Sequence, residues 1–180
     1  MEFIKSGQLG KVTLSRALNY KPRENIGKVP AAIAPVDGRV KGEFRDTKGT
    51  KMEAADVDYT LWSAPRAPTP FSREQFHYDW HWQWAYGNGD IGNQGPHQLD
   101  VGRWALGNPE QLPSKVMCFG NRYGMNDDGE TANNQVAFYE YGDRAPLMMD
   151  SRGLPAKDMN FKGQMPAFMG LRIGNVIHLE

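Results

Sequence analysis

The second half of the chain is a succession of short segments rich in β-forming residues, and this pattern constrains the fold more than any other feature. Three such segments are separated by turn-forming sequences such as Asn-Asp-Asp-Gly and Tyr-Gly-Asp. They are residues 114–122, 134–141 and 146–152. Residues 174–178 predict a turn into another strand. Near the N-terminus, Val12, Leu14 and Leu18 share one parity, so residues 10–20 also predict a strand.

One helix is expected between these β segments. Asn93 is its candidate N-cap, and Pro96 falls in the first turn, where the missing N–H of proline costs nothing. Gly107 is expected to end it.

The region between the first strand and this helix is harder to assign. Residues 21–56 are rich in proline, glycine and charge, and we interpret them as a solvated, loop-rich insertion. A short hairpin at 41–51 is one alternative within it, and a ligand lid is the functional alternative. A short helical turn is expected at 57–62, and residues 3–7 resemble the last turn of a helix with a glycine stop.

Size and composition exclude several classes of protein. The chain has 180 residues, which is enough for one domain with a single core. Lys plus Arg and Asp plus Glu both number 21, and this balance argues against a nucleic-acid or polybasic membrane binder. No apolar run approaches the roughly 18 residues of a membrane helix. The single cysteine, Cys118, excludes an internal disulfide and a cysteine-based zinc cluster, and we expect it to be a small buried residue.

Aromatic residues occupy every even position from 76 to 86, and mostly polar residues lie between them. Alternation with a period of two separates the rings from the polar groups only in an extended chain, so the segment predicts a strand or an extended arm. The rings fit two interpretations. The commoner fate of Trp and Tyr is a core or interface stripe, and the alternative is a set of stacking faces in a sugar-binding cleft.

The expected helix carries the main candidates for catalysis. His97 and Asp100 are three residues apart, and Asn93 is four residues before His97, so all three would share one helix face. In the first turns, outward N–H groups and the positive end of the helix dipole suit a neutral imidazole that exchanges a proton beside an oxyanion. The structural alternative is that Asn93 only caps the helix and His97 only bonds a loop, and spacing alone does not separate the two.

A metal site is a further hypothesis, because histidines and carboxylates bind zinc and harder ions. Its candidates are His77, His81 and His97, with Asp79 and Asp90 nearby. Residues four apart on a strand are separated by about 13 Å, so two histidines of the aromatic segment would share one ion only if that segment bends.

A glycine pattern, Gly87-x-Gly89-x-x-Gly92, has the spacing of a dinucleotide-binding fingerprint. The preceding segment does not read as a strand buried on both faces, and no parallel βαβ pattern follows. Tight turns explain the same glycines.

Two blocks of sequence carry a more specific signal. The first is Phe-His-Tyr-Asp-Trp-His-Trp at 76–82, and the second is Tyr-Gly-Asn-Gly-Asp-Ile-Gly-Asn-Gln-Gly-Pro-His-Gln-Leu-Asp at 86–100. Together they resemble the C-terminal domain of bacterial Gfo/Idh/MocA oxidoreductases, the glucose–fructose oxidoreductase and inositol dehydrogenase family. The resemblance extends to residues 3–12, 58–62 and 127–131 and so covers most of the chain.

The resemblance implies an α+β fold, an open and mostly antiparallel β-sheet with helices packed on one face. It implies that residues 1–180 are a single substrate-binding and oligomerisation domain, incomplete at both ends. The family motif Asp-x-Gly-x-His reads Asn93-Gln94-Gly95-Pro96-His97 here. His97 takes the place of the family's acid/base, and Asn93 replaces an aspartate; an amide can orient a hydroxyl but cannot take its proton.

In that family an N-terminal Rossmann domain binds NAD or NADP and supplies a catalytic lysine from a Glu-Lys-Pro segment. Neither is found in this sequence. We therefore expect no cofactor binding and no dehydrogenase turnover by the 180 residues alone. The expected partners are a sugar-like small molecule, a Rossmann domain in cis and further copies joined through the sheet, with no nucleic acid and no membrane. The chain shows no signal for a compartment, so the cytoplasm is the default and export through a missing N-terminus is the alternative.

The leading hypothesis is thus the substrate domain of an oxidoreductase acting on a sugar or cyclitol hydroxyl. Its expected catalytic residues are His97 and Asn93, and its expected substrate contacts are His77, Tyr78, His81 and Asp100. One alternative is a non-catalytic sugar-binding or assembly module that uses the aromatic row. The other is a metal-dependent hydrolase or isomerase.

Overall fold

The structure, a computed structural model, forms two compact units. The first contains Met1–Arg23, Asp90–Tyr123 and Ala132–Glu180, and the second contains Glu24–Gly89 and Gly124–Thr131. The structure describes residues 1–29, 39–40, 43–45, 51–53, 57–70, 72–73, 75–154 and 165–180. Within these ranges no helix is long and apolar enough to cross a membrane.

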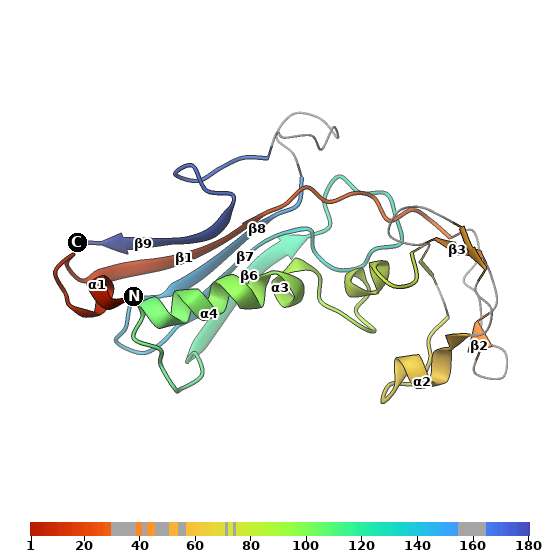
Figure 1. The fold of residues 1–180 in the computed structure, drawn as a ribbon, viewed down its shortest axis with the longest axis horizontal. Coiled ribbons are helices and arrows are strands. Elements are labelled where there is room, and N and C mark those ends of the chain that lie inside the picture. Colours follow the sequence, from red (N-terminus) through yellow and green to blue (C-terminus); the bar gives the residue numbers. More distant parts are fainter. Residues whose placement is uncertain are drawn as a thin grey trace. The chain divides into compact units, whose positions relative to one another are not determined.

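A five-stranded sheet forms the first unit (Figure 1). Its order is β6-β7-β8-β1-β9, and every neighbouring pair is antiparallel except β1 and β8, which are parallel. The strands are β1 (Val12–Tyr20), β6 (Lys115–Asn121), β7 (Asn134–Glu140), β8 (Leu147–Arg152) and β9 (Ile173–Leu179). All five were expected from the sequence, and the open, mostly antiparallel sheet of an α+β fold is confirmed.

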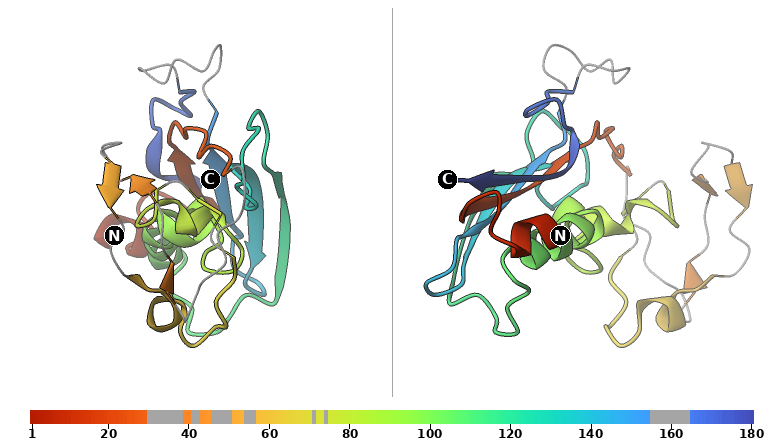
Figure 2. Two further views of the ribbon diagram at one scale, coloured as in Figure 1. Left: turned by 90° about the vertical axis from the view of Figure 1, so that its right-hand side faces the viewer. Right: turned by 60° about the vertical axis from the view of Figure 1, so that its left-hand side comes forward.

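Helices cover one face of this sheet. Helix α4 (Gly95–Ala105) packs on β1, β8 and β9 (Figure 2). The expected helix start at Asn93 is wrong: Asn93 is the last residue of a separate short helix, α3 (Asp90–Asn93), and α4 has Gln94 as its N-cap. Pro96 lies in the first turn and Gly107 follows the helix with a φ of +83°, as expected. The short helix α1 (Glu2–Lys5) precedes β1.

Helix α4 approaches the sheet most closely at Gly102. A Cβ built there would lie 2.5 Å from Leu147 Cδ1 and 3.1 Å from Ser15 Oγ, and the Ser15 hydroxyl donates to the Gly102 carbonyl at 3.1 Å. A larger side chain at this position would force the helix away from the sheet. Glycine therefore fixes the distance between α4 and the strands beneath it.

We predict that Gly102→Ala lowers the free energy of unfolding by about 1–3 kcal/mol, although alanine is the better helix former, because overpacking outweighs propensity. Leu147→Val removes the δ-methyl groups that the new Cβ would meet. In a double-mutant cycle by urea unfolding, Leu147→Val should therefore cost less in the Gly102→Ala background than in the native chain. Additive effects of the two substitutions would contradict this explanation.

The two faces of the sheet differ in chemistry. On the helix side, Ala17, Ala137 and Met149 form a buried cluster. On the opposite side, Asp150 is fully buried and accepts hydrogen bonds from Arg16 Nη2 at 2.6 Å, Tyr20 OH at 2.7 Å and Arg152 Nε at 2.7 Å. Burial alone would raise the pKa of Asp150, but these three donors outweigh it and hold the pKa below its ordinary value.

The expectation for Cys118 is wrong. The residue lies in β6, and the whole of this strand is exposed. Helix α4 packs on β1, β8 and β9, while β6 lies two strands beyond β8 at the edge of the sheet. The composition of a strand does not predict whether it lies at the centre or at the edge of a sheet. For this reason the sequence led us to expect a buried Cys118.

The second unit consists of short elements. They are β2 (Arg39–Val40) paired with β5 (Val57–Asp58), β3 (Glu43–Arg45) paired with β4 (Lys51–Glu53), helix α2 (Tyr59–Ser63) and the 3-10 helix η1 (Asp79–Trp82). The pairing of β3 with β4 confirms the short hairpin, and α2 confirms the helical turn; most of the remaining insertion lies outside the described residues. The strand expected over 76–86 is wrong, because η1 and flanking turns occupy this segment.

Candidate functional site

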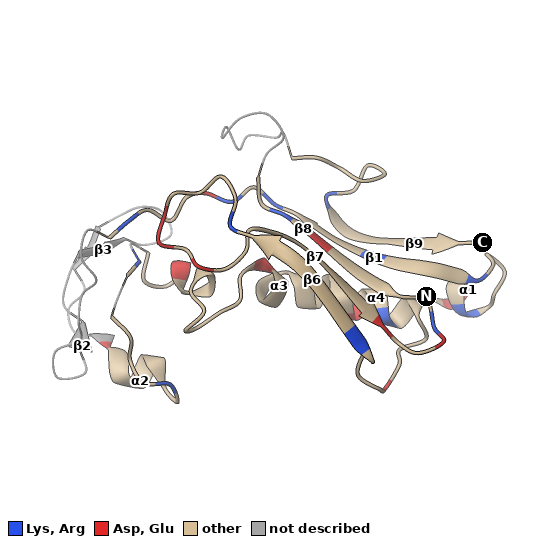
Figure 3. Ribbon diagram, turned by 180° about the vertical axis from the view of Figure 1, so that it is seen from behind, with Lys and Arg blue, Asp and Glu red and all other residues tan. Residues whose placement is uncertain are grey.

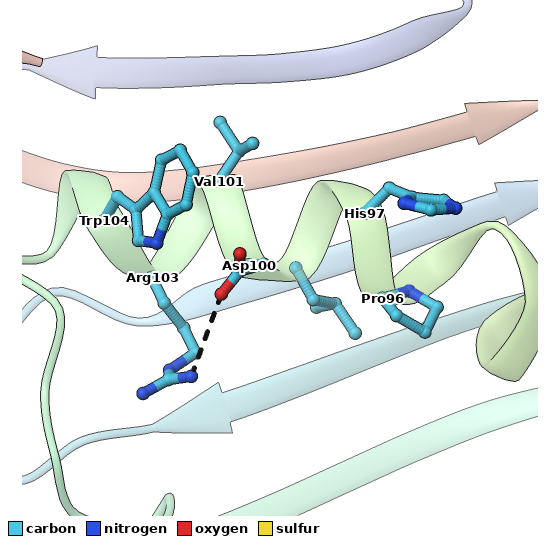
Figure 4. A pocket seen from close by; sticks show the side chains of 7 residues that line it. Pro96, His97, Asp100, Val101, Arg103 and Trp104 are labelled. Carbon is cyan, nitrogen blue, oxygen red and sulfur yellow. Dashed lines mark ion pairs between the residues drawn. The ribbon is translucent and has the colours of Figure 1, made fainter.

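The solvent-facing side of α4 carries the first part of the site. Gly95, Gly102 and Ala105 are its buried residues, whereas His97, Asp100 and Trp104 are exposed. These three follow one another at intervals of three and four residues and so share one face. They line an open groove of about 700 Å³ together with Pro96, Leu99, Val101 and Arg103 (Figure 4).

His97 lies at the N-terminal end of this groove. Its ring makes no hydrogen bond to any residue in the described ranges, and Figure 4 shows it projecting from the first turn of α4. The structural alternative from the sequence, a histidine held by a loop contact, thus finds no support among these residues. Its side chain is exposed, and an imidazole can exchange a proton with a bound molecule.

Asp100 forms a long ion pair with Arg103, three residues further along the same helix. Its Oδ1 lies 4.0 Å from Arg103 Nη1, and the side chains of Asp100 and Arg103 are 53% and 36% exposed. Arg103 Nη2 also donates to the carbonyl of Pro109 at 2.7 Å, which anchors the guanidinium against the loop after α4. The groove therefore offers an imidazole, a carboxylate and a fixed guanidinium along one helix.

Asn93 is exposed at the end of α3, so it does not share a helix with His97. The junction between α3 and α4 is held by Gln94, which accepts from Lys21 Nζ at 2.7 Å and donates to Gln98 at 3.1 Å. Arg23 also anchors α3, since its guanidinium bonds both carboxylate oxygens of the buried Asp90. Asp90 therefore serves as an ion-pair partner in this structure.

In the second unit, the candidates His77, Tyr78 and His81 have different surroundings. His81 is buried, and its Nδ1 lies 2.6 Å from the carbonyl oxygen of Tyr78. The rings of Tyr78 and Trp80 contact the His81 ring at 5.0 and 5.9 Å between centroids. His77 and Tyr78 are exposed. Only these two present their side chains to solvent, and His81 supports the turn that carries them.

This turn is fixed by a buried arginine that sequence reasoning did not single out. Arg73 is 1% exposed, and its Nε donates to the Phe76 carbonyl at 3.0 Å while Nη1 donates to Gln83 Oε1 at 3.3 Å. Gln83 in turn donates from Nε2 to the Ser72 hydroxyl at 2.6 Å. Both ends of the segment that carries His77 and Tyr78 are thus tied to residues 72–73.

Four aromatic rings surround this guanidinium. Its central carbon lies 4.6 Å from the centroid of Trp62, 4.7 Å from Phe76, 5.5 Å from Tyr86 and 5.9 Å from Tyr59. We call these rings the aromatic box. Burial lowers the pKa of Arg73 from its ordinary value, and contacts with the ring faces compensate part of the lost hydration.

The Tyr86 hydroxyl joins three segments of the second unit. It lies 2.8 Å from Tyr59 OH, 2.9 Å from Thr69 Oγ1 and 3.4 Å from Ser63 Oγ. Burial would raise the pKa of Tyr86, but these hydrogen bonds outweigh it and lower the pKa. Burial, with the same bond to Tyr86, raises the pKa of Tyr59.

The glycine pattern after this segment has a structural explanation. A Cβ at Gly87 would lie 2.6 Å from His81 Cα and 2.7 Å from its carbonyl oxygen, so only glycine fits against this backbone. The Gly87 N–H donates to Gln83 O at 2.8 Å and the Gly89 N–H to His81 O at 2.7 Å. Both amides that could have cradled a phosphate are therefore used within the turn.

A metal centre is likewise not formed by the part of the chain that the structure describes. No group of three or more His, Cys, Asp or Glu side chains in those ranges lies close enough to hold an ion. Of the carboxylates considered, Asp90 bonds Arg23, and Asp79 Oδ2 accepts from the Gln75 amide at 3.2 Å.

Comparison with known proteins places these features in a family. Residues 42–165 match the model for the C-terminal alpha/beta domain of the Gfo/Idh/MocA oxidoreductase family. The chain belongs to this family. A search of curated proteins found no match.

Among solved structures, the chain is similar to the WlbA dehydrogenase from Bordetella pertussis, determined in complex with NADH and UDP-GlcNAcA. The identity is 14% and the TM-score is 0.46. The match covers 85% of this chain and 31% of the WlbA chain, so this domain spans about a third of that protein's length.

The groove of this Gfo/Idh/MocA domain contains two side chains that sequence reasoning left out, Arg103 and Trp104. Trp104 follows His97 by seven residues, and this spacing alone could have placed it on the same face. For Arg103 the signal was weaker, because its position is set by the Pro109 carbonyl in the following loop. Asp100 and His97 are brought together as expected, whereas Asn93 and the three candidates of the second unit belong to other elements.

Proposed function

We propose that this chain is the substrate-side domain of a nicotinamide-dependent oxidoreductase that acts on a sugar or cyclitol hydroxyl. The observation that carries the proposal is the exposed His97 at the end of a groove lined by Asp100, Arg103 and Trp104. Family membership supports an oxidoreductase, and the groove supplies the side chains that a polyhydroxy substrate needs.

In this proposal His97 exchanges the proton of the reacting hydroxyl, since neutral imidazole is the usual general base near neutral pH. Asp100 and Arg103 bind neighbouring hydroxyl groups, and Trp104 packs against the apolar C–H face of the ring. Asn93 orients the substrate by hydrogen bonding. In the second unit, taken by itself, His77 and Tyr78 are the exposed candidates for contact with a sugar, and His81 supports the turn that carries them.

The hydride acceptor of such a reaction is NAD or NADP, and the described residues do not fit it. The amides of Gly87 and Gly89 are bonded within their own turn, and the element before them is the 3-10 helix η1 instead of a strand. We therefore assign cofactor binding to a Rossmann domain joined to this one, and expect the 180 residues alone to show no NADH binding and no turnover.

The same domain is proposed to form homo-oligomers through the face of the sheet opposite α4. Phe119 and Met117 lie on that face, because their β7 partners Val136 and Phe138 pair in turn with Asp150 and Met148. They are 79% and 40% exposed. Phe119→Asp should lower the oligomeric state measured by light scattering, and an unchanged state would argue against this face.

Labelling with 5-fluorotryptophan provides the test of the substrate site. Trp104 is the only tryptophan in the first unit, and the other four lie between residues 62 and 84. Titration with myo-inositol or glucose should shift the Trp104 fluorine resonance, and His97→Ala should weaken this response while the exposed Leu112→Ala leaves it unchanged. NADH alone should shift no resonance. A Trp104 resonance that stays fixed at saturating sugar would refute the site.

The same fluorine spectra also test a second candidate function, in which the chain is a non-catalytic sugar-binding module. It is favoured by the exposed rings of Trp84 (61%), Tyr78 (41%) and Trp80 (37%) in the second unit. A sugar response confined to the Trp80 and Trp84 resonances would support this module and exclude the groove on α4.

A further inference from the structure

Strand β6 is an edge of the sheet that the described chain leaves open on one side. It is hydrogen-bonded to β7, and within the described ranges no strand pairs with its other side. Every residue of β6 is exposed, including Phe119 (79%) and Val116 (53%). A regular strand with a free edge presents a row of N–H and C=O groups that fit another strand.

Apart from Lys115 at its first position, β6 lacks the features that normally protect such an edge. Between Lys115 and Asn121 the sequence is Val-Met-Cys-Phe-Gly, without a charge or a proline (Figure 3). Its register with β7 is continuous over all seven residues, so no bulge bends the strand away. Monomeric proteins usually place charged side chains, prolines or bulges on edges of this kind.

We propose that β6 is a self-association edge, at which β6 of a second copy pairs antiparallel about a two-fold axis at Cys118. This proposal is independent of the proposed enzymatic function. The register centred on the middle residue is the one that pairs all seven positions of both strands, and two-fold symmetry makes the contact self-complementary.

The side chains suit this register. Met117 of one copy would face Phe119 of the other, a favourable sulfur–aromatic pair. Val116 would face Gly120, and Lys115 would face Asn121, so no like charges meet. A second copy therefore pairs with the whole edge and brings no like charges together, so the occupant of this edge is a second copy of the chain.

Cys118 makes the pairing directly measurable. Residues directly opposite in an antiparallel pair have Cα atoms about 4.5–5.5 Å apart, which lies within the roughly 4.4–6.8 Å range of disulfides. Cys118 pairs with Ala137 and so lies on the α4 side of the sheet, opposite Met117 and Phe119. A disulfide between two copies thus reports edge pairing and not association through the other face.

The test uses the 180-residue chain with diamide, which accepts the two electrons and two protons released when a pair of thiols forms a disulfide. We expect a disulfide-linked dimer whose yield rises with protein concentration and which Cys118→Ser abolishes. Partial burial raises the pKa of the Cys118 thiol, so the reaction is run at mildly alkaline pH. Absence of the linked dimer at concentrations where the chain is associated would overturn the proposal.

Two further measurements keep the result independent of oxidation. Cys118→Lys places two ammonium groups opposite each other and should remove the edge-paired species in light scattering, with circular dichroism as the control for folding. Hydrogen exchange of the native chain should show amides of 115–121 that gain protection as concentration rises. Protection that is already complete in dilute protein would mean that another segment covers the edge, and would refute self-pairing.

Discussion

Replacing Arg73 by alanine should lower the free energy of unfolding of the second unit by about 3–5 kcal/mol. The substitution empties the aromatic box and leaves the Phe76 carbonyl and Gln83 Oε1 without their guanidinium donors. It also removes contacts with four ring faces, each worth up to about 2 kcal/mol when desolvated. Urea unfolding followed by tryptophan fluorescence measures this unit, because four of the five tryptophans lie within it.

Three matched variants identify which property of Arg73 stabilises the second unit. Arg73→Lys keeps the charge but loses the planar fork, so we expect an intermediate loss of about 1–3 kcal/mol. Arg66→Ala removes an exposed arginine of the same unit and should change stability by less than about 0.5 kcal/mol. Arg73→Met fills the space without charge. If that variant were as stable as the native chain, packing alone would explain the box and the role of the cation would be disproved.

The aromatic box also explains why the strand expected over 76–86 is not formed. The alternation of aromatic and polar residues is real, but three local contacts favour turns instead. The His81 ring is hydrogen-bonded to the Tyr78 carbonyl, and the Gly87 N–H donates to the Gln83 carbonyl. Arg73 Nε donates to the Phe76 carbonyl. Phe76 and Trp82 are buried while Trp80 and Trp84 are exposed, so the rings do not share one face.

The sheet was predictable because its strands combine alternating or β-branched residues with clear turn sequences between them. The positions of those strands within the sheet were not, and this is why Cys118 was assigned to a core. The order of strands depends on pairings between segments more than a hundred residues apart, such as Ser15 with Leu147 and Ser15 with Ile177. No local pattern encodes such pairings.

The candidate site was predictable to the extent that it lies on one helix. His97 and Asp100 were placed together by their spacing, and α4 presents both to the same groove. Asn93 was misplaced because α3 ends at this residue and α4 begins only at Gly95, with Gln94 as its N-cap. Both sides of this junction are helical. Neither residue 93 nor residue 94 is a proline, so the sequence gives no signal for a break between two helices.

The second large effect is expected at Asp150, on the face of the sheet opposite α4. Asp150→Asn should lower the free energy of unfolding by about 3–5 kcal/mol at neutral pH, because it leaves the cation of Arg16 without its carboxylate in a largely buried position. Arg16 also stacks on Phe168, with 3.8 Å from its central carbon to the ring, and so has little freedom to reach water. Asp143→Asn, at an exposed turn between β7 and β8, is the matched control and should change stability little.

The pH dependence follows from the lowered pKa of Asp150. In the unfolded chain the carboxyl titrates near its reference value of about 3.9, whereas in the folded chain it stays ionised to lower pH. Its contribution to stability is therefore fully present above about pH 5 and is lost as pH falls through the folded pKa. The difference in unfolding free energy between the native chain and Asp150→Asn should be constant near neutrality and shrink in acid. A difference that persists unchanged in acid would show that packing of the amide, and not the charge of Asp150, sets the stability of this face.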